Sequence, residues 1–554
     1  MTRSVQIVER MRWMSALAGA AIVALAVGIA FAIFSGQLVS DASSASLGAG
    51  GSAAALDPRI ATLAERHPNA SLQAIVQFNA PVAEAKAQAD AKAHGRIIGN
   101  LPIIHGLAIQ TTAAQARALA TYADVHAVSL NTTVTTQSVR MPMMPGSAGV
   151  SSDQLQSTYA QTLGVTPLWK FGVTGTGVGV AVIDTGIDGS LSDFASAGDG
   201  NSRVIVSAVD NPQATTANDG YGHGTDVAGI IAGDGNNRTD ALHGQYVGIA
   251  PNANLVSIKV ADETGATTVL DVIYGLQFAV EHRAQYNIRV LNLSLDASTP
   301  QSYKTDPLDA AVEATWMHGI VVVVAAGNRG SASDAVQYSP ANDPYVITVG
   351  GVDENGTANP SDDAIASWSS RGTTQDGIQK PDVYAPGAHI VSVLAPGSAF
   401  ADSNCGCVIG GGQYIQTSGT SMAAPMIAGL AADLLQVHPR WTPDQVKGDL
   451  SSSAVSDNSS LQEPNAVKAV LNWNPPSADQ GLTPSNLLSA ATGSVKYTLG
   501  TWSLATWSRA NGALRAGYAN QSYTCKTCSA TSSGTVNSSL GTWNLATWNT
   551  TSLN

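Results

Sequence analysis

The sequence predicts an α/β protein in which a large parallel-sheet domain follows a smaller β-α-β-β-α-β domain. Apolar runs without alternation, at 178–184, 254–260 and 320–328, are typical of strands buried on both faces. Helical stretches at 269–284 and 307–318 alternate with such runs and indicate the crossovers of a parallel sheet. Ligand chemistry in these sheets gathers at the carboxyl ends of the strands, so we expect the functional residues there.

The smaller domain is predicted over residues 56–131. Its strand-like runs are "LQAIVQF", "RIIGN", "HGLAIQT" and "VHAVSL", and its helices are an Ala-rich stretch that ends at His94 and "AAQARALATY". This order is the ferredoxin-like arrangement. Residues 132–158 are rich in Thr, Ser, Gln, Met and Pro without periodicity, which predicts an exposed linker.

The N-terminal residues 1–40 indicate export. Three arginines precede an uncharged apolar run at 13–34, and small residues follow it through a linker at 41–55. This pattern is typical of a secretory signal peptide. The run is also long enough to span a bilayer, so an uncleaved anchor with the protein facing outward is the alternative.

The large domain is predicted over residues 159–456, with a Pro- and Ser-containing linker at 457–495. The tail at 496–554 contains "LGTWSLATW" and "LGTWNLATW", two copies of one pattern. We expect a small module of β type, in which four tryptophans either pack internally or form a patch that contacts carbohydrate or a cell surface.

Composition excludes some classes of partner and supports export. Charged residues make up 12% of the 554-residue chain and the formal net charge is −13, without a basic stripe, which argues against nucleic acid. The four cysteines favour local disulfides in an exported chain, with a shared zinc site as the alternative; the pairing cannot be deduced. They are Cys405, Cys407, Cys525 and Cys528.

Three polar residues stand where this architecture would place a site. Asp184 ends a buried strand, His223 precedes an apolar helix, and Ser421 stands at the start of another helix, where backbone N–H groups favour developing negative charge. Taken singly, they are typical of a turn acid, a loop histidine and an N-cap. Their combination is what indicates a catalytic site.

The surrounding motifs resemble those of the subtilisin-like serine peptidases. "VIDTGID", "GHGTDVAG" and "SGTSMAAPMIAG" are similar to the family's aspartate, histidine and serine motifs, in the family's order, and "VAAGNRG" is similar to its oxyanion motif. The resemblance implies a subtilisin-like catalytic domain. It also implies that residues 56–131 are an inhibitory prodomain and that maturation cleaves within 132–158.

The chemistry that the resemblance implies is acyl transfer to a serine. Ser421 would attack a peptide carbonyl, His223 would take and return the proton, and Asp184 would orient the imidazole. The oxyanion would be bound by the Asn328 side chain and the Ser421 N–H. We therefore expect an exported endopeptidase made as a self-inhibited precursor. The alternative is a catalytically idle binding or scaffold protein on the same fold.

The resemblance also implies that a substrate lies extended between two strand edges, the segment after Lys259 and the one that contains Ser294, Leu295 and Asp296. The floor of the main pocket would be Ala325, Ala326 and Gly327. Asp296 stands where the family commonly has glycine, and it is either a solvated loop acid or a group that favours basic substrate side chains. No cofactor is implied for the chemistry; the family allows structural calcium, for which the sequence assigns no ligands.

Asp226 stands where many members of the family have a second histidine. An acid in the first turn of a helix stabilises that helix through the dipole, which is one interpretation. The other is that the carboxylate lies close enough to His223 to raise the pKa of the imidazole.

Overall fold

The computed structural model describes residues 54–79, 84–139, 157–196, 198–236, 242–401, 407–454, 461–482 and 484–485. The predicted signal or anchor segment, the tail module and three of the four cysteines (Cys405, Cys525 and Cys528) lie outside these residues. In the part of the chain that the structure describes, one helix is long and apolar enough to cross a membrane. It is α10 (Thr420–Val437), which is buried in the core.

The N-terminal domain has the predicted strand and helix order, with one strand and one helix added in front. Its sheet has the order β1-β5-β2-β4-β3, and α2 begins where the Asp57 side chain accepts the Arg59 N–H ahead of Pro58. The strands are β1 (Ala55–Leu56), β2 (Ser71–Phe78), β3 (Gly95–Leu101), β4 (Gly106–Thr112) and β5 (Val125–Leu130), and the helices are α2 (Pro58–Arg66), α3 (Glu84–His94), η1 (Pro102–Ile104) and α4 (Ala113–Leu119).

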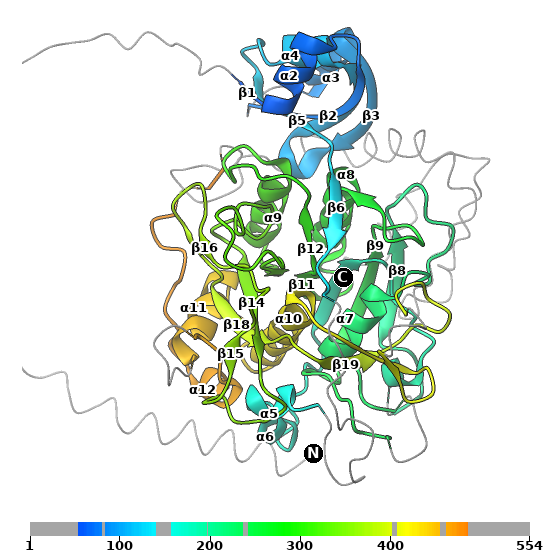
Figure 1. Ribbon diagram of the computed structural model, residues 1–554, viewed down its shortest axis with the longest axis vertical. Helices are drawn as coiled ribbons and strands as arrows, with labels where there is room; N and C mark the ends of the chain where they lie inside the picture. The colour runs from blue at the N-terminus through cyan, green and yellow to red at the C-terminus, as the bar shows by residue number, and fades with distance from the viewer. Residues whose placement is uncertain are drawn as a thin grey trace, which may run out of the picture. The chain divides into compact units, whose positions relative to one another are not determined.

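The large domain is built on an eight-stranded sheet that is parallel except for one edge strand (Figure 1). The order is β15-β14-β13-β11-β7-β9-β8, and β18 pairs with β14. Its central strands are the predicted Val- and Ile-rich runs, which are buried along their length because helices cover both faces. The strands are β7 (Gly179–Asp184), β8 (Val204–Val209), β9 (Asn254–Lys259), β11 (Ile288–Leu293), β13 (Val321–Ala325), β14 (Ile347–Asp353), β15 (Ala364–Ile365) and β18 (Val383–Pro386).

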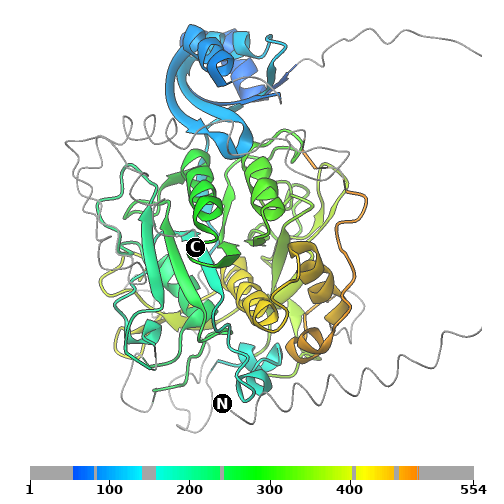
Figure 2. The same cartoon turned by 180° about the vertical axis from the view of Figure 1, so that it is seen from behind.

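Two pairs of helices pack against opposite faces of this sheet. α7 contacts α10, whereas α8 contacts α9, the two green helices that lie side by side in Figure 2. α8 begins at a capping box of Thr268 and Asp271, and α9 begins with Asp306 as N-cap and Pro307 in its first turn. The helices are η2 (Ser192–Phe194), α5 (Tyr159–Thr162), α6 (Thr166–Trp169), α7 (His223–Ala232), α8 (Val269–His282), α9 (Pro307–Met317), α11 (Pro443–Ser453) and α12 (Ala466–Leu471).

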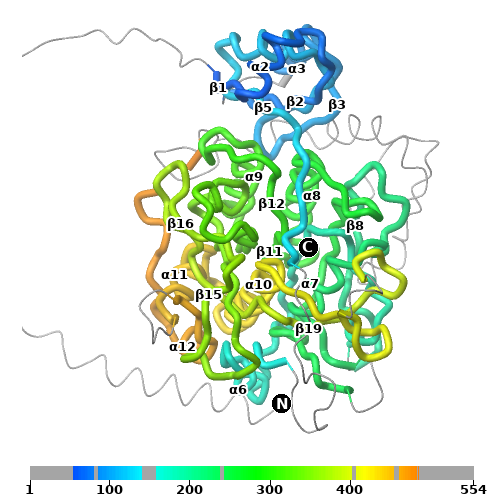
Figure 3. Tube along the Cα trace, in the orientation of Figure 1, coloured from blue at the N-terminus to red at the C-terminus, as the bar shows by residue number. Residues whose placement is uncertain are grey.

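The start of the predicted exposed linker is instead a strand, so that prediction is wrong for these residues. β6 (Thr133–Thr136) pairs antiparallel with β12 (Leu295–Ala297) on one side and with β10 (Thr267–Thr268) on the other. Figure 3 shows the cyan β6 segment beside β12. Val134 on one face of β6 is buried, whereas Thr133 and Thr135 on the other face are exposed. Residues 140–156, the middle of the predicted linker, lie outside the described part.

The predicted boundary at Ser456 is too early. α12 packs on α10 and α11, and Leu461 is buried in a small cluster with Val352 and Tyr384. Further on, Ser485 donates its N–H and hydroxyl to the buried Glu313 of α9. The described residues of the predicted 457–495 linker therefore belong to the large domain. The remaining strands are β16 (Gly372–Thr373), β17 (Gln379–Lys380), β19 (Ile390–Val393), β20 (Val408–Ile409) and β21 (Tyr414–Thr417).

Candidate active site

Asp184 and His223 come together because a strand ends where a helix begins. Asp184 is the last residue of β7 and His223 the first of α7, and Asp184 Oδ1 lies 2.7 Å from His223 Nδ1. Both side chains are buried. A glycine at 224 permits this approach, since a Cβ there would lie 2.2 Å from the carbonyl oxygen of Gly186. The hydrogen bond directs His223 Nε2 away from the aspartate, and this nitrogen has no hydrogen-bond partner among the described residues.

A second buried carboxylate, Asp219, holds the two segments in register and was missed by the sequence reasoning. It accepts hydrogen bonds from Gly222 N (2.6 Å), Thr225 N (2.8 Å), Thr225 Oγ1 (2.7 Å) and Thr185 Oγ1 (2.9 Å). Thr185 Oγ1 in turn accepts the N–H of Gly224 at 2.8 Å. Asp219 therefore ties the residue after Asp184 to the residues that flank His223. Its only signal in the sequence is its position just before the histidine motif.

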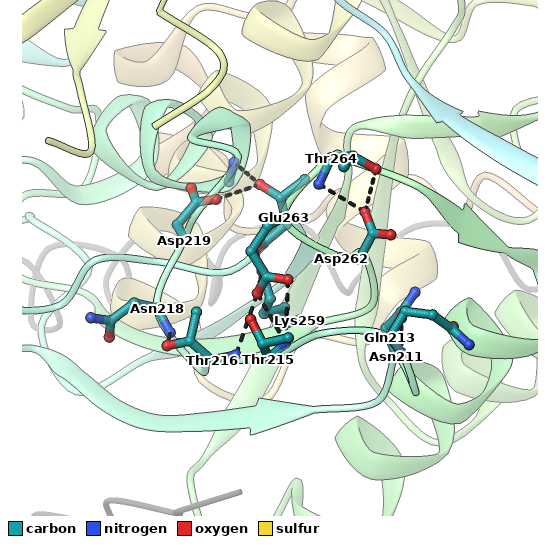
Figure 4. A network of polar contacts seen from close by, with 12 residues as sticks. Asn211, Gln213, Thr215, Thr216, Asn218, Asp219, Lys259, Asp262, Glu263 and Thr264 are labelled. Atoms are coloured by element: carbon teal, nitrogen blue, oxygen red, sulfur yellow. Dashed lines mark hydrogen bonds and ion pairs between the residues drawn. The ribbon is translucent and has the colours of Figure 1, made fainter. Parts of the chain in front are cut away.

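Lys259 and Glu263 support the same loop from the next strand (Figure 4). The Lys259 side chain is fully buried, and its Nζ donates to the Thr185 carbonyl at 2.6 Å and lies 3.8 Å from Glu263 Oε1. Glu263 accepts the N–H groups of Thr215 and Thr216 in the loop before Asp219. Burial lowers the pKa of Lys259, an effect that the nearby Asp219 and Glu263 oppose. Lys259 thus places a positive charge close to Asp219 and Glu263, in the region that supports His223.

Ser421 lies in the first turn of α10, where the N–H groups of Thr420 and Ser421 donate outside the helix, to Asn328 and Gln137. Gly419 is the N-cap, with a φ of 141°, a value that side-chain-bearing residues rarely adopt. Ser421 Oγ donates to the Ser294 carbonyl (3.0 Å) and accepts the Gln137 N–H (3.0 Å). The serine hydroxyl is therefore bonded to Ser294 and Gln137 and not to His223 Nε2, which has no hydrogen-bond partner among the described residues.

Asn328 lies beside this helix terminus with its amide oriented by Thr420. Its Oδ1 accepts the Thr420 N–H at 3.0 Å, so its Nδ2 is the group left to donate. Nδ2 is buried without a hydrogen-bond partner among the described residues. A Cβ built on Gly419 would lie 2.5 Å from the Gln137 carbonyl oxygen and 3.2 Å from Asn328 Nδ2, which locates both in one small space. A glycine at 419 keeps that space open.

The chain itself occupies the groove between the two predicted strand edges. β6 is hydrogen-bonded to both β10 and β12, and the Gln137 carbonyl that follows it accepts the Ser421 N–H at 3.1 Å. Beyond it, the Val139 N–H donates to the Ser418 carbonyl. Gln137 was not predicted as a site residue, because its position against Ser421 depends on the pairing of β6 with strands more than 130 residues away.

The predicted pocket residues lie together, and one of them differs from expectation. Ala325 and Ala326 are buried at the end of β13, and Gly327 follows them with its Cα facing Asp296 and Arg329. Asp296 is fully buried and ion-paired to Arg329, so it is not a solvated loop acid. Burial raises the pKa of Asp296, an effect that the hydrogen bond to Arg329 opposes.

The charges around His223 raise its affinity for a proton. Burial alone lowers the pKa of the imidazole, but Asp184, together with Asp226 and Asp219, outweighs burial, and the net shift is upward. Asp226 is itself fully buried, accepts the Thr417 hydroxyl at 3.2 Å, and has its pKa raised by burial to about 8. Asp226 does lie in the first turn of α7, as one interpretation predicts, and it is buried there.

The described residues bear on the sequence expectations for metal sites and disulfides. Among them, no group of three or more His, Cys, Asp or Glu side chains is arranged to hold a metal ion. Cys407 is disulfide-bonded. That the disulfides are local stays a prediction.

The parallel-sheet fold, with a bonded Asp–His pair at one helix start and a serine at another, is typical of the class of subtilisin-like serine peptidases. Comparisons with known proteins agree. The chain is 41% identical over 302 residues to the serine protease AprX of Bacillus subtilis (strain 168), which covers 54% of this chain and 65% of AprX. It is 37% identical over 319 residues to subtilisin E of the same organism, covering 56% of this chain and 71% of subtilisin E.

The particular family follows from a direct match. The sequence model of the subtilase family, Peptidase S8, matches residues 175–481, and the chain belongs to that family. Fervidolysin from Fervidobacterium pennivorans, a keratinolytic enzyme related to subtilisin, matches the structure with a TM-score of 0.55 at 25% identity. This match covers 74% of this chain and 62% of fervidolysin, so the chain spans less than two thirds of fervidolysin and of AprX.

Proposed function

We propose that this protein is an exported serine endopeptidase that is made as a self-inhibited precursor. The observation that carries the proposal is the contact of Gln137 with Ser421, in which a peptide carbonyl accepts the N–H beside the candidate nucleophile at 3.1 Å. A substrate carbonyl held in this way would be positioned for attack. Family membership and the Asp184–His223 hydrogen bond support the chemistry.

In the proposed reaction His223 Nε2 accepts the proton of Ser421 as Oγ attacks the peptide carbon. The imidazolium that forms is stabilised by Asp184 and then protonates the leaving amine. The oxyanion receives the Ser421 N–H and Asn328 Nδ2, which is the otherwise unpartnered donor in that space. Water then attacks the ester of the acyl-enzyme with the help of His223, which releases the carboxylic acid product and restores Ser421.

Self-inhibition is proposed from the contacts of the N-terminal domain with the large domain. Ile103 and Ile104 of η1 belong to the same hydrophobic cluster as residues of α8 and α9, and the Ile103 N–H donates to Gln277 Oε1 at 3.3 Å. The Leu270 N–H at the start of α8 donates to Asn131 Oδ1. These contacts anchor the domain from which β6 extends, so that β6 would exclude other polypeptides from the groove.

Replacement of the nucleophile tests this proposal. Wild type should be recovered as separate N-terminal and mature fragments that hydrolyse casein, whereas Ser421→Ala should remain full-length and inactive. Ser190→Ala, at an exposed loop serine, is the matched control and should behave as wild type. A wild type without activity would support the idle scaffold instead. A Ser421→Ala protein that is still processed in pure form would show that Ser421 is not the nucleophile.

Export is tested by fractionation. The apolar run at 13–34 supports it, and subtilisins are among the relatives. Recovery in culture fluid would indicate a cleaved signal, recovery on intact cells with protease accessibility would indicate the anchor, and retention in the cytoplasm would contradict export.

A further inference from the structure

The Gln137 side chain is hydrogen-bonded at both ends of its amide. Its Nε2 donates to Asp296 Oδ1 at 2.5 Å, and its Oε1 accepts the Asn328 N–H at 3.2 Å. The same residue presents its carbonyl to Ser421, so its side chain occupies the pocket that would receive the residue before a scissile bond. The pocket therefore offers an acceptor, the Asp296 carboxylate, on one wall and a donor, the Asn328 N–H, on another.

The acid in this pocket is already neutralised. Asp296 is fully buried, and its Oδ2 is bonded to an Arg329 Nη1, while its Oδ1 faces Gln137. Arg329 is held in turn by Tyr338, whose ring centroid lies 3.6 Å from the guanidinium carbon. Gly327 leaves room for the pair, since a Cβ there would lie 3.0 Å from Arg329 Nη1 and 3.2 Å from Asp296 Oδ2.

The pair has no net charge, and its Asp296 Oδ1 is an acceptor that the Gln137 side chain fills. A lysine in the pocket would gain Asp296 but would be repelled by Arg329, and a glutamate would place its carboxylate against Asp296. A leucine would bury Asp296 Oδ1 with only the weaker donor Thr135 Oγ1, at 3.3 Å. An uncharged amide is the side chain that satisfies both walls.

We propose that the Asp296–Arg329 pair makes this pocket select glutamine, and that the bond cleaved on maturation is therefore Gln137–Ser138. In that cleavage Ser421 Oγ forms an ester with the Gln137 carbonyl carbon, the Gln137–Ser138 C–N bond breaks, and the amine of Ser138 takes the proton. Water then hydrolyses the ester. The inference rests on the proposed peptidase function.

Peptides that span residues 133–139, flanked by a fluorophore and a quencher, test the selection with mature wild-type enzyme. Position 137 is varied as Gln, Leu, Lys or Glu. We expect kcat/KM for Gln to exceed that for Leu by about 10-fold and those for Lys and Glu by about 100-fold, because a buried polar group left unpaired discriminates strongly. N-terminal sequencing should give Ser138 as the first residue of the mature chain.

Charge changes in the pocket should reorder the peptides in opposite directions. Asp296→Asn removes the ion-pair partner of Arg329 and should make the Glu peptide better than the Lys peptide, whereas Arg329→Gln should do the reverse. Lys170→Gln, at an exposed lysine, is the control and should keep the wild-type order.

Two results distinguish a failure of the glutamine selection from a failure of the proposed peptidase function. Cleavage of casein with Leu or Lys preferred at position 137, or with a mature N-terminus elsewhere, overturns the glutamine selection and leaves the peptidase standing. Absence of cleavage of both casein and peptides overturns both. The wild-type panel decides the question even if a pocket variant does not fold.

Discussion

Asp219→Asn removes the carboxylate that ties the strand end to the histidine loop. The Gly222 N–H and the Thr225 N–H donate to different oxygens of Asp219, at 2.6 and 2.8 Å. An asparagine has one oxygen, so one of these buried N–H groups must face an NH₂ group, whereas the two threonine hydroxyls can rotate to accept. Loss of a charge-assisted bond costs about 1.5–3 kcal/mol, and an unsatisfied buried donor costs about 1–3 kcal/mol.

The neutral amide also avoids burying a charge, and burial is the main reason that the pKa of Asp219 is raised. We therefore expect a net loss of about 3 kcal/mol in the free energy of unfolding, near the lower part of the summed range. Because Gly222 and Thr225 flank His223, we also expect kcat/KM to fall about 100-fold, the effect of a misplacement of about 1 Å.

The assay is urea denaturation in a Ser421→Ala background, which prevents autolysis, together with peptide hydrolysis in the active background. Asp199→Asn is the control, since Asp199 also accepts a backbone N–H, from Asn201 at 3.0 Å, but in an exposed loop. If Asp219→Asn matches this control in both measurements, the network does not position the histidine.

Three further predictions concern close packing and titration. Gly224→Ala must move α7 or β7 apart by about 0.8 Å to bring a 2.2 Å contact to 3.0 Å, and kcat/KM should fall about 100-fold, whereas Gly198→Ala, in open space, should not change it. Asp226→Asn removes an acid that raises the pKa of His223, so the acidic limb of kcat/KM against pH should move downward. The shift should be less than about one unit, because Asp226, with a pKa of about 8, is only partly ionised there; an unmoved limb contradicts the tuning role. Glu463→Gln should be more stable than wild type at pH 8 but not at pH 5, as measured by thermal unfolding in the Ser421→Ala background. Burial and the adjacent Asp363 raise the folded-state pKa of Glu463, so the native state keeps a proton that the unfolded state loses above about pH 4.3. The stability of wild type therefore falls with rising pH, by up to about 1.4 kcal/mol per pH unit. Equal pH dependence of the two proteins would refute this.

Local pattern was sufficient for most of the fold because the central strands have no polar face. The predicted run at 254–260 became β9 (Asn254–Lys259), and the helix predicted at 307–318 became α9 (Pro307–Met317). The predictions failed at 133–136 and at α12 (Ala466–Leu471), which are too short or too polar to show periodicity. Such segments adopt a regular structure only when a partner supplies the other half of the hydrogen bonds or the apolar surface.

The sequence by itself predicted the chemistry-bearing residues, since Asp184, His223 and Ser421 stand, in order, in motifs that resemble those of the family. The tertiary structure decided how their surroundings behave. Asp296 is an acid by sequence, but only its burial against Arg329 makes it a neutral acceptor. Gln137 is an ordinary linker residue until β6 adds to two distant strands. Charge compensation and strand pairing both join residues far apart in the chain, and a local pattern carries no information about such distances.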